Sequence, residues 1–202
     1  MHCKCPIILL DGWCERQPFN GVLINNIDSA QNAVGTSSPA GTGRSAMSAA
    51  PSASRPSRPA NAVTARPCWT TASSWSPAVV TVGTKTDSAY EGMLAYLDTK
   101  PGLPTAFFVD NDLIAFGVMR ALKDRGYRVP DDVSIVGFDD VAYCTVSSPA
   151  LTTIHVNKRS MGWEAVRRLL TMMDDPNTGI FKIESCTEFV ERDSVRSYEV
   201  EE

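Results

Sequence analysis

The sequence predicts an α/β fold with mainly parallel sheets, and two observations support this prediction. Apolar strand-like runs alternate along the chain with segments of helical periodicity, which is typical of strand–helix–strand units in a parallel sheet. Two of the runs, 105–109 and 133–138, each end in a cluster of carboxylates. Because ligands bind outside the carboxyl ends of parallel strands, these acids predict a small-molecule site.

The elements can be placed in chain order from the apolar pattern and the capping residues. The best-defined helix is 113–125, whose apolar residues recur at helical spacing and are followed by the helix-stopping Gly126. Strands are expected at 6–10, 21–26, 79–82, 105–109, 133–138 and 183–190, with an extended crossover at 149–154. Helices are expected at 28–34 after an Asp28 cap, at 88–97 after an Asp87 cap, at 113–125 and at 160–173.

Length and composition exclude several classes of protein. A chain of 202 residues with 43% hydrophobic residues can bury a core in one large or two small domains. Its net charge of -4 argues against these residues forming a nucleic-acid-binding surface. No apolar run approaches the roughly 20 residues of a membrane span, and the start lacks the long apolar core of a secretory signal. We therefore expect a cytoplasmic protein with no membrane partner.

The six cysteines are scattered, and a protein of the reducing cytoplasm keeps its thiols free. His2, Cys3 and Cys5 could be imagined as zinc ligands, but no second Cys-x-x-Cys pair follows them. We expect no metal and no cofactor.

Residues 35–78 have a different composition, with ten Ser, ten Ala and six Pro but no Asp, Glu, Lys, Ile, Leu, Phe or Tyr. Burial of so few large apolar residues would not offset the entropy of ordering the backbone, so we expect disorder or irregular coil. Two interpretations stay open. The segment is either a natural linker or a local reading-frame slip, which the abrupt edges at Val34 and Val79 favour.

A glycine-containing motif lies inside this segment, at residues 41–46. Its sequence, Gly-Thr-Gly-Arg-Ser-Ala, fits the loose dinucleotide-binding pattern G-x-G-x-x-G/A. No strand precedes the motif and no acidic residue follows it within the segment, so we do not expect a nucleotide site.

Three motifs in order, LPTAFFVDNDLIAFG (103–117), RVPDDVSIVGFDD (128–140) and PALTTI (149–154), resemble the effector-binding domain of the LacI/GalR family of bacterial transcription regulators. The resemblance implies a two-lobed, periplasmic-binding-protein-like fold with an effector in the cleft between the lobes. It also implies an incomplete N-terminal lobe at 1–34, the segment 35–78, and the C-terminal lobe at 79–202. The family's helix-turn-helix headpiece is absent, so operator DNA would be bound only by a part of the parent protein that this chain lacks, in an intact homodimer.

The resemblance also implies the effector-binding residues. Asp139 stands where the family uses a carboxylate to accept hydrogen bonds from sugar or nucleoside hydroxyls, and Asn111 stands where an amide contacts the ligand. Thr84 occupies a position where an aromatic ring commonly stacks on the ligand. Asp112 is expected either to contact the effector or to cap the following helix, and a capping role also stays open for Asn111. Asp11 and Trp13, after the first strand, are expected to line the opposite wall, and packing against the other lobe stays open for Trp13.

The expected function is therefore that of a sensor for a small polar effector, most simply a carbohydrate, and not that of an enzyme. No Ser/His/Asp set and no metal cluster accompanies the carboxylates, and His155 is expected to hydrogen-bond between the lobes and not to act in catalysis. The alternatives are a solute-binding protein of a sugar importer, a nonfunctional gene fragment, and a hydrolase that uses Asp112 and Asp139 as a carboxylate pair.

Overall fold

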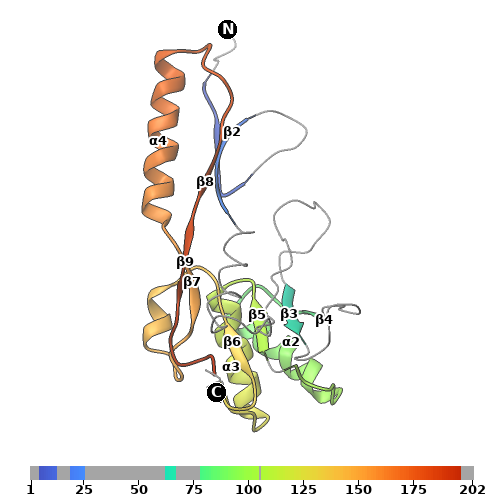
Figure 1. The fold of residues 1–202 in the computed structure, drawn as a ribbon. Coiled ribbons are helices and arrows are strands. Elements are labelled where there is room, and N and C mark those ends of the chain that lie inside the picture. Colours follow the sequence, from blue (N-terminus) through green and yellow to red (C-terminus); the bar gives the residue numbers. More distant parts are fainter. Residues whose placement is uncertain (1–4, 13–18, 26–61, 67–77, 105, 197–202) are drawn as a thin grey trace, which may run out of the picture. The chain divides into compact units, whose positions relative to one another are not determined.

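The computed structural model describes residues 5–12, 19–25, 62–66, 78–104 and 106–196 (Figure 1). The chain divides into two compact units. Unit 1 comprises Met1–Asn25 and Val156–Thr187, and unit 2 comprises Asn26–His155 and Glu188–Glu202. The predicted boundaries differ from this division, because residues 156–187 join unit 1 and not the lobe expected at 79–202.

Unit 1 contains a three-stranded parallel sheet in the order β1-β2-β8. Ile8 of β1 (Ile8–Leu10) pairs with Asn20 of β2 (Asn20–Ile24), and Gly21 pairs with Lys182 of β8 (Lys182–Ser185). Helix α4 (Lys158–Asp174) contacts β1 and β2 and runs alongside β2 and β8 in Figure 1. Parallel strands need a crossover between them, and α4 supplies the crossover that precedes β8.

Unit 2 contains a four-stranded sheet in the order β4-β3-β5-β6. Strands β5 (Ala106–Val109) and β6 (Ser134–Val136) are parallel, as expected, and Phe107 pairs with Ile135. Strand β3 (Ala62–Arg66) is antiparallel to both β4 (Ala78–Thr81) and β5. Residues 62–66 and Ala78 of the segment 35–78 thus belong to strands, and the rest of that segment lies outside the described residues. The interpretation of the segment as disordered or frame-slipped stays a prediction. Strand pairing supplies backbone hydrogen bonds that composition alone does not reveal.

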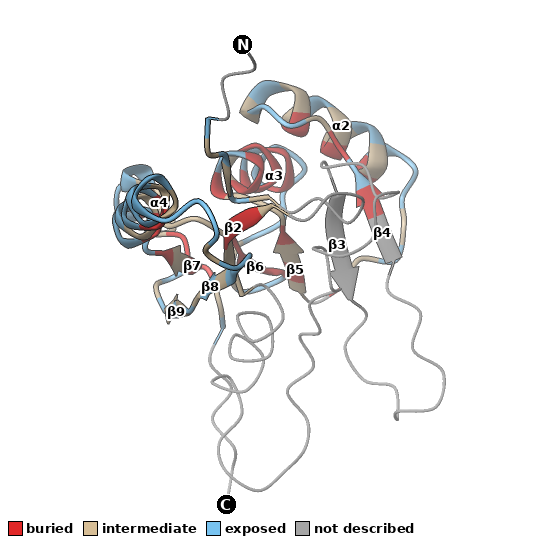
Figure 2. Cartoon of the chain, turned by 90° about the horizontal axis from the view of Figure 1, so that it is seen from above, coloured by how far each residue is buried: buried red, intermediate tan, exposed pale blue. Residues whose placement is uncertain are grey.

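Two helices pack together beside this sheet, α2 (Thr86–Asp98) and α3 (Asp112–Asp124). The cap of α2 is Lys85 and not the predicted Asp87, which lies in the first turn. Figure 2 shows that buried residues are concentrated in α3 and in β5 and β6. The buried apolar residues of unit 2 include Val80, Val82, Ala89, Met93, Phe107, Val109, Ile114, Val118, Leu122, Val133, Ile135 and Leu151.

The last elements are a short 3-10 helix, η1 (Ala142–Thr145), and a two-stranded sheet of β7 (Thr153–Val156) and β9 (Thr187–Val190). The single strand predicted at 183–190 is wrong, because β8 and β9 belong to different sheets. Parallel bridges join Val136 to Thr152 and Asp139 to His155. The segment that contains β7 therefore lies beside β6 and the residues that follow it, parallel to them. Among the described residues, no helix has the length and hydropathy that a membrane span requires.

Candidate functional site

The carboxyl ends of β5 and β6 lie next to each other, as the sequence predicts for neighbouring parallel strands. The Asp112 N–H, after β5, donates a 2.9 Å hydrogen bond to the carbonyl of Phe138, after β6. This contact brings three of the predicted site residues, Asn111, Asp112 and Asp139, to one edge of unit 2.

Asn111 caps helix α3. Its side-chain oxygen accepts a 2.9 Å hydrogen bond from the N–H of Ile114, and its extended backbone is typical of an N-cap residue. The capping interpretation of Asn111 is confirmed. Its contact with an effector stays a prediction, because the side chain is only partly buried.

Asp112 is fully buried, and its carboxylate has three hydrogen-bond donors. The Thr153 hydroxyl donates to Oδ1 over 2.6 Å, the Val141 N–H donates to Oδ2 over 2.9 Å, and the Cys144 thiol lies 3.1 Å from Oδ2. A buried polar group needs such partners. The effector contact of Asp112 stays a prediction. In this placement the carboxylate accepts hydrogen bonds inside the unit and joins α3, η1 and β7.

Gly137 makes this arrangement possible. A Cβ atom at this position would lie 2.2 Å from Asp112 Oδ1 and 3.0 Å from a methyl carbon of Leu151. Only a residue without a side chain lets the segment after β6 approach the buried carboxylate so closely.

Cys144 is buried beside the same carboxylate. Burial, together with the hydrogen bond to Asp112, raises the pKa of the Cys144 thiol to about 12. The thiol is therefore protonated at neutral pH and acts as a hydrogen-bond donor, not as a nucleophile.

Asp139 and Asp140 form a turn with left-handed backbone at both positions, φ 108 and φ 54. The Asp139 N–H donates a 2.9 Å hydrogen bond to the carbonyl of Ile154. Asp139 is partly buried, at the carboxyl end of β6 where the sequence predicts an effector-binding carboxylate.

The Asp140 carboxylate is held by two cationic or potentially cationic groups. Its Oδ1 accepts a 2.7 Å hydrogen bond from Arg192, and its Oδ2 lies 2.9 Å from Nδ1 of His155. Burial by itself raises the pKa of Asp140, but the hydrogen bonds from Arg192 and His155 outweigh burial and hold that pKa below its ordinary value. Asp140 is therefore ionised at neutral pH.

The remaining predicted site residues lie elsewhere. Thr84 is exposed in the turn between β4 and α2. Asp11 lies in unit 1 after β1, with φ 55 and its N–H donating to the Val22 carbonyl over 2.8 Å. Burial raises the pKa of Asp11, opposed by the charge of Lys158. Trp13 lies outside the described residues, as do His2 and Cys3.

Sequence reasoning missed Arg192 and Thr153 as partners of the acidic cluster. The two contacts join residues that are 52 and 41 positions apart, and no local pattern signals such a pairing. The sequence predicts a hydrogen bond of His155 between the lobes, whereas the hydrogen bond that the structure shows, to Asp140, lies within unit 2. Among the described residues, no group of three or more His, Cys, Asp and Glu side chains is placed to hold a metal ion.

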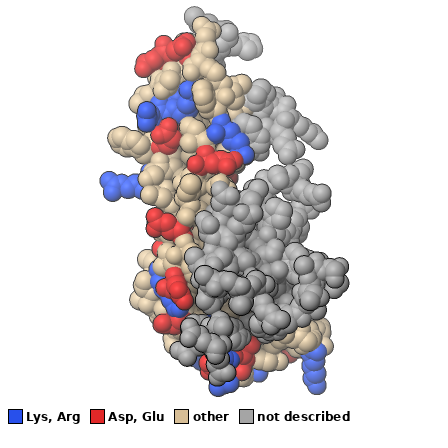
Figure 3. All heavy atoms as spheres, in the orientation of Figure 1, with Lys and Arg blue, Asp and Glu red and all other residues tan. Residues whose placement is uncertain are grey.

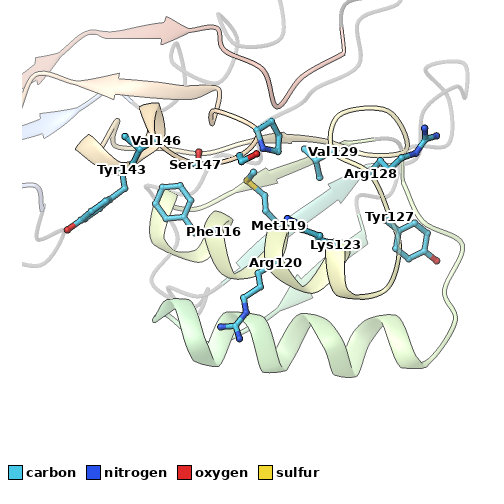
Figure 4. A pocket seen from close by; sticks show the side chains of 12 residues that line it. Phe116, Met119, Arg120, Lys123, Tyr127, Arg128, Val129, Tyr143, Val146 and Ser147 are labelled. Atoms are coloured by element: carbon cyan, nitrogen blue, oxygen red, sulfur yellow. The ribbon is translucent and has the colours of Figure 1, made fainter.

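A separate groove of about 690 Å³ lies on the outer side of α3, and none of the predicted effector residues lines it (Figure 4). Its apolar rim includes Tyr143 and Val146 of the η1 region, which are 68% and 75% exposed. Arg120 of this groove stacks over the Tyr90 ring at 4.3 Å. The lining residues are Phe116, Met119, Arg120, Lys123, Tyr127, Arg128, Val129, Tyr143, Val146, Ser147, Ser148 and Pro149.

Charged side chains of both signs are interspersed on the face seen in Figure 3, and no broad basic patch lies on the part of that face that the structure describes. This distribution agrees with the net charge of -4. Such a face lacks the positive potential that attracts a phosphate backbone.

Comparisons with known proteins agree on one family. The model of the periplasmic binding protein-like domain matches residues 39–195. The HTH-type transcriptional repressor PurR of Haemophilus influenzae (strain PittEE) is 36% identical over 138 residues, 67% of this chain and 38% of that protein. The probable HTH-type transcriptional repressor ExuR of Bacillus subtilis (strain 168) is 38% identical over 110 residues, 54% of this chain and 33% of that protein.

One solved structure adds a ligand. A LacI family transcriptional regulator from Enterococcus faecium with bound ribose matches with a TM-score of 0.53 and 27% identity, covering 59% of this chain and 44% of that chain. The chain thus spans between 33% and 38% of the length of the two curated relatives.

Proposed function

The chain belongs to the family of periplasmic binding protein-like domains, in the form found in LacI-type regulators, and on this premise we propose that it is the effector-sensing part of a transcription regulator. Its effector is a carbohydrate, and the intact regulator works in the cytoplasm as a sensor and not as an enzyme. The observation that supports this proposal most is the position of Asp139 at the carboxyl end of β6. A sugar is the proposed effector because a relative of this family was solved with bound ribose.

The chemistry of the proposed contact is simple. An ionised carboxylate accepts hydrogen bonds from two or more hydroxyl groups, and charge-assisted bonds are roughly twice as strong as neutral ones. A vicinal diol of a sugar supplies two such donors at a fixed spacing. Asp139 is the proposed acceptor, Asn111 an additional polar contact, and Thr84 and Asp11 remain predicted contacts to be tested by their own variants.

A thermal-shift titration of this chain with D-ribose, lactose and cellobiose tests the sugar proposal. A ligand at about a hundredfold excess over its Kd stabilises the native state by about 2.7 kcal/mol, a shift of several degrees. We expect Asp139→Ala to abolish the shift. Asp131→Ala is the matched control, since Asp131 is an exposed acid of the same unit whose ion pair is with Arg128. Unchanged sugar binding in Asp139→Ala would remove Asp139 from the site.

DNA binding belongs, in this proposal, to a part of the intact regulator outside these residues. The relatives are about three times as long as the region they share with this chain, and they are named as HTH-type repressors. An effector that favours one conformation of the sensor shifts the population of the whole molecule by its differential affinity for the two states.

We also propose that the intact regulator is a homodimer, which uses the groove beside α3. Exposed apolar side chains, among them Tyr143 and Val146, mark a surface that a soluble protein usually covers. Light scattering of this chain tests the proposal: we expect a dimer that Val146→Asp converts to a monomer, while Val166→Asp, a similarly exposed valine on α4, leaves the dimer intact. A wild-type monomer at high concentration would count against this surface.

A further inference from the structure

The turn at Asp139 and Asp140 has a backbone that its own residues do not favour. Both residues are non-glycine and both have positive φ, 108 and 54. Side chains make this region of conformational space unfavourable, and such residues persist only where the surrounding structure holds them. The contacts around the turn therefore matter for the direction in which Asp139 is presented.

Contacts with neighbouring segments hold the turn from outside. The Asp139 N–H donates to the Ile154 carbonyl over 2.9 Å, and the Asp140 carboxylate binds Arg192 at 2.7 Å and His155 at 2.9 Å. The side chains of Asp140 and Arg192 are only 17% and 16% exposed, so water screens their attraction weakly.

The partners of Asp140 come from the two segments by which the chain passes between the units. His155 is the last residue of unit 2 before Val156 begins the second segment of unit 1. Arg192 follows Glu188, where the chain returns to unit 2. The Asp140 carboxylate thus connects both segments that join the units, through His155 and Arg192, to the turn that carries the proposed effector contact.

We propose that Asp140 is a positioning residue, which with Arg192 and His155 fastens the turn of Asp139 to both passages between the units. This proposal rests on the proposed function for the role of Asp139. The consequence is that the side-chain orientation of Asp139 is coupled to the two segments that join the units. A reorientation of Asp139 on effector binding moves these segments, and a movement of these segments reorients Asp139.

A purely stabilising ion pair is the simpler role, and hydrogen exchange distinguishes the two. Asp140→Asn keeps a side chain that tolerates φ 54 but removes the charge, and Arg192→Lys keeps the charge but removes the guanidinium geometry. We expect each variant to raise the exchange rate of the Asp139 amide by roughly tenfold, with unchanged exchange in 106–109 of β5. Cooperative thermal unfolding confirms that each variant is folded, and Arg192→Lys covers the case in which Asp140→Asn does not fold.

Asp132→Asn is the matched control. Asp132 also holds an arginine of unit 2, Arg128, through two side-chain hydrogen bonds of 3.2 and 3.0 Å, but it lies far along the chain from both passages. Equal exchange of the Asp139 amide in Asp140→Asn and Asp132→Asn would overturn the proposal.

A glycine–alanine comparison at position 140 tests the contribution of the backbone strain, and Arg192→Lys separates positioning from direct contact of Asp140 with the ligand. Both Asp140→Gly and Asp140→Ala remove the carboxylate, but only glycine adopts φ 54 without strain. With D-ribose as the probe, we expect Asp140→Gly to bind several-fold more tightly than Asp140→Ala. D-ribose binding should also weaken in Arg192→Lys, which keeps the Asp140 carboxylate but alters the group that fastens it. Unchanged binding in Arg192→Lys would overturn the positioning role. If wild type does not bind D-ribose, the sugar proposal fails for that ligand, while the exchange experiment still decides the proposal for Asp140.

Discussion

The hydroxyl of Thr153 donates a 2.6 Å hydrogen bond to the buried carboxylate of Asp112. The bond joins the first turn of α3 to β7, the strand that leads out of unit 2. With the Val141 N–H and the Cys144 thiol on the other oxygen, this carboxylate organises the loop after β6. An acid that the sequence offers as an effector contact thus serves the internal structure of the unit.

Asp112→Ala is expected to destabilise the chain by about 3 kcal/mol, because it leaves two buried donors, Thr153 and Cys144, and the partly buried Val141 N–H without this acceptor. Urea unfolding monitored by circular dichroism measures the change. Asp131→Ala, at an exposed acid, should change stability by less than about 0.5 kcal/mol. Equal stability of the two variants would show that the carboxylate contributes no net stabilisation.

Gly137→Ala is expected to cost about 1–3 kcal/mol, since the new methyl group would lie 2.2 Å from Asp112 Oδ1. The clash has a specific partner, so the effects of Gly137→Ala and Asp112→Ala should be non-additive. A double-mutant cycle in urea unfolding measures this coupling. Additive costs would place the strain at another neighbour, such as Leu151.

The pKa of Cys144, raised to about 12, predicts an alkaline loss of stability. The unfolded thiol ionises near pH 8.5 and the folded thiol does not, so the free energy of unfolding falls as pH rises above that value, by up to about 1.4 kcal/mol per pH unit. Comparison of the wild type with Cys144→Ala between pH 8 and pH 10.5 isolates this thiol.

In the wild type, iodoacetamide at pH 9 should modify the exposed Cys186 and spare Cys144. Rapid modification of both would contradict the burial of Cys144.

The lowered pKa of Asp140 predicts a loss of stability at acidic pH. Its folded pKa lies below the unfolded value near 3.9, so its stabilising contribution is present above about pH 4 and is lost as pH falls through the folded pKa. Asp140→Asn should therefore be less stable than wild type at pH 6, with the difference shrinking toward pH 3. A difference that does not change with pH would assign the effect to packing.

Arg168 predicts a defect confined to unit 1. It is 9% exposed, and its side chain stacks on the Phe181 ring at 4.4 Å. Its guanidinium donates hydrogen bonds to Asn20 Oδ1 over 2.8 Å, to the Thr178 hydroxyl over 3.2 Å, and to the Gly179 carbonyl. Arg168→Met should cost about 2–4 kcal/mol, because the buried Asn20 and two less buried acceptors, Thr178 and Gly179, lose their donor. Hydrogen exchange should rise in β2 and β8 and stay unchanged in α3; a uniform rise would contradict a local role. Arg167→Met, at an exposed neighbour on α4, is the control.

The sequence by itself determined the local elements of the strand–helix–strand unit from β5 to β6. Helix α3 was predicted within one residue at each end, because its apolar spacing, the Asn111 cap and Gly126 are all local signals. The three ordered motifs also identified the family that the comparisons confirm. These features need only neighbours in the sequence, or a conserved order of motifs, to be recognised.

Only the tertiary structure decided the partners of these elements. It paired β3 with β4 and β5, assigned 156–187 to unit 1, buried Asp112 against Thr153, and placed Arg192 on Asp140. The physical reason is distance along the chain: a carboxylate looks the same in the sequence whether it faces water, a sugar or a buried hydroxyl 41 residues away. Its role depends on which donors the packed chain brings to it.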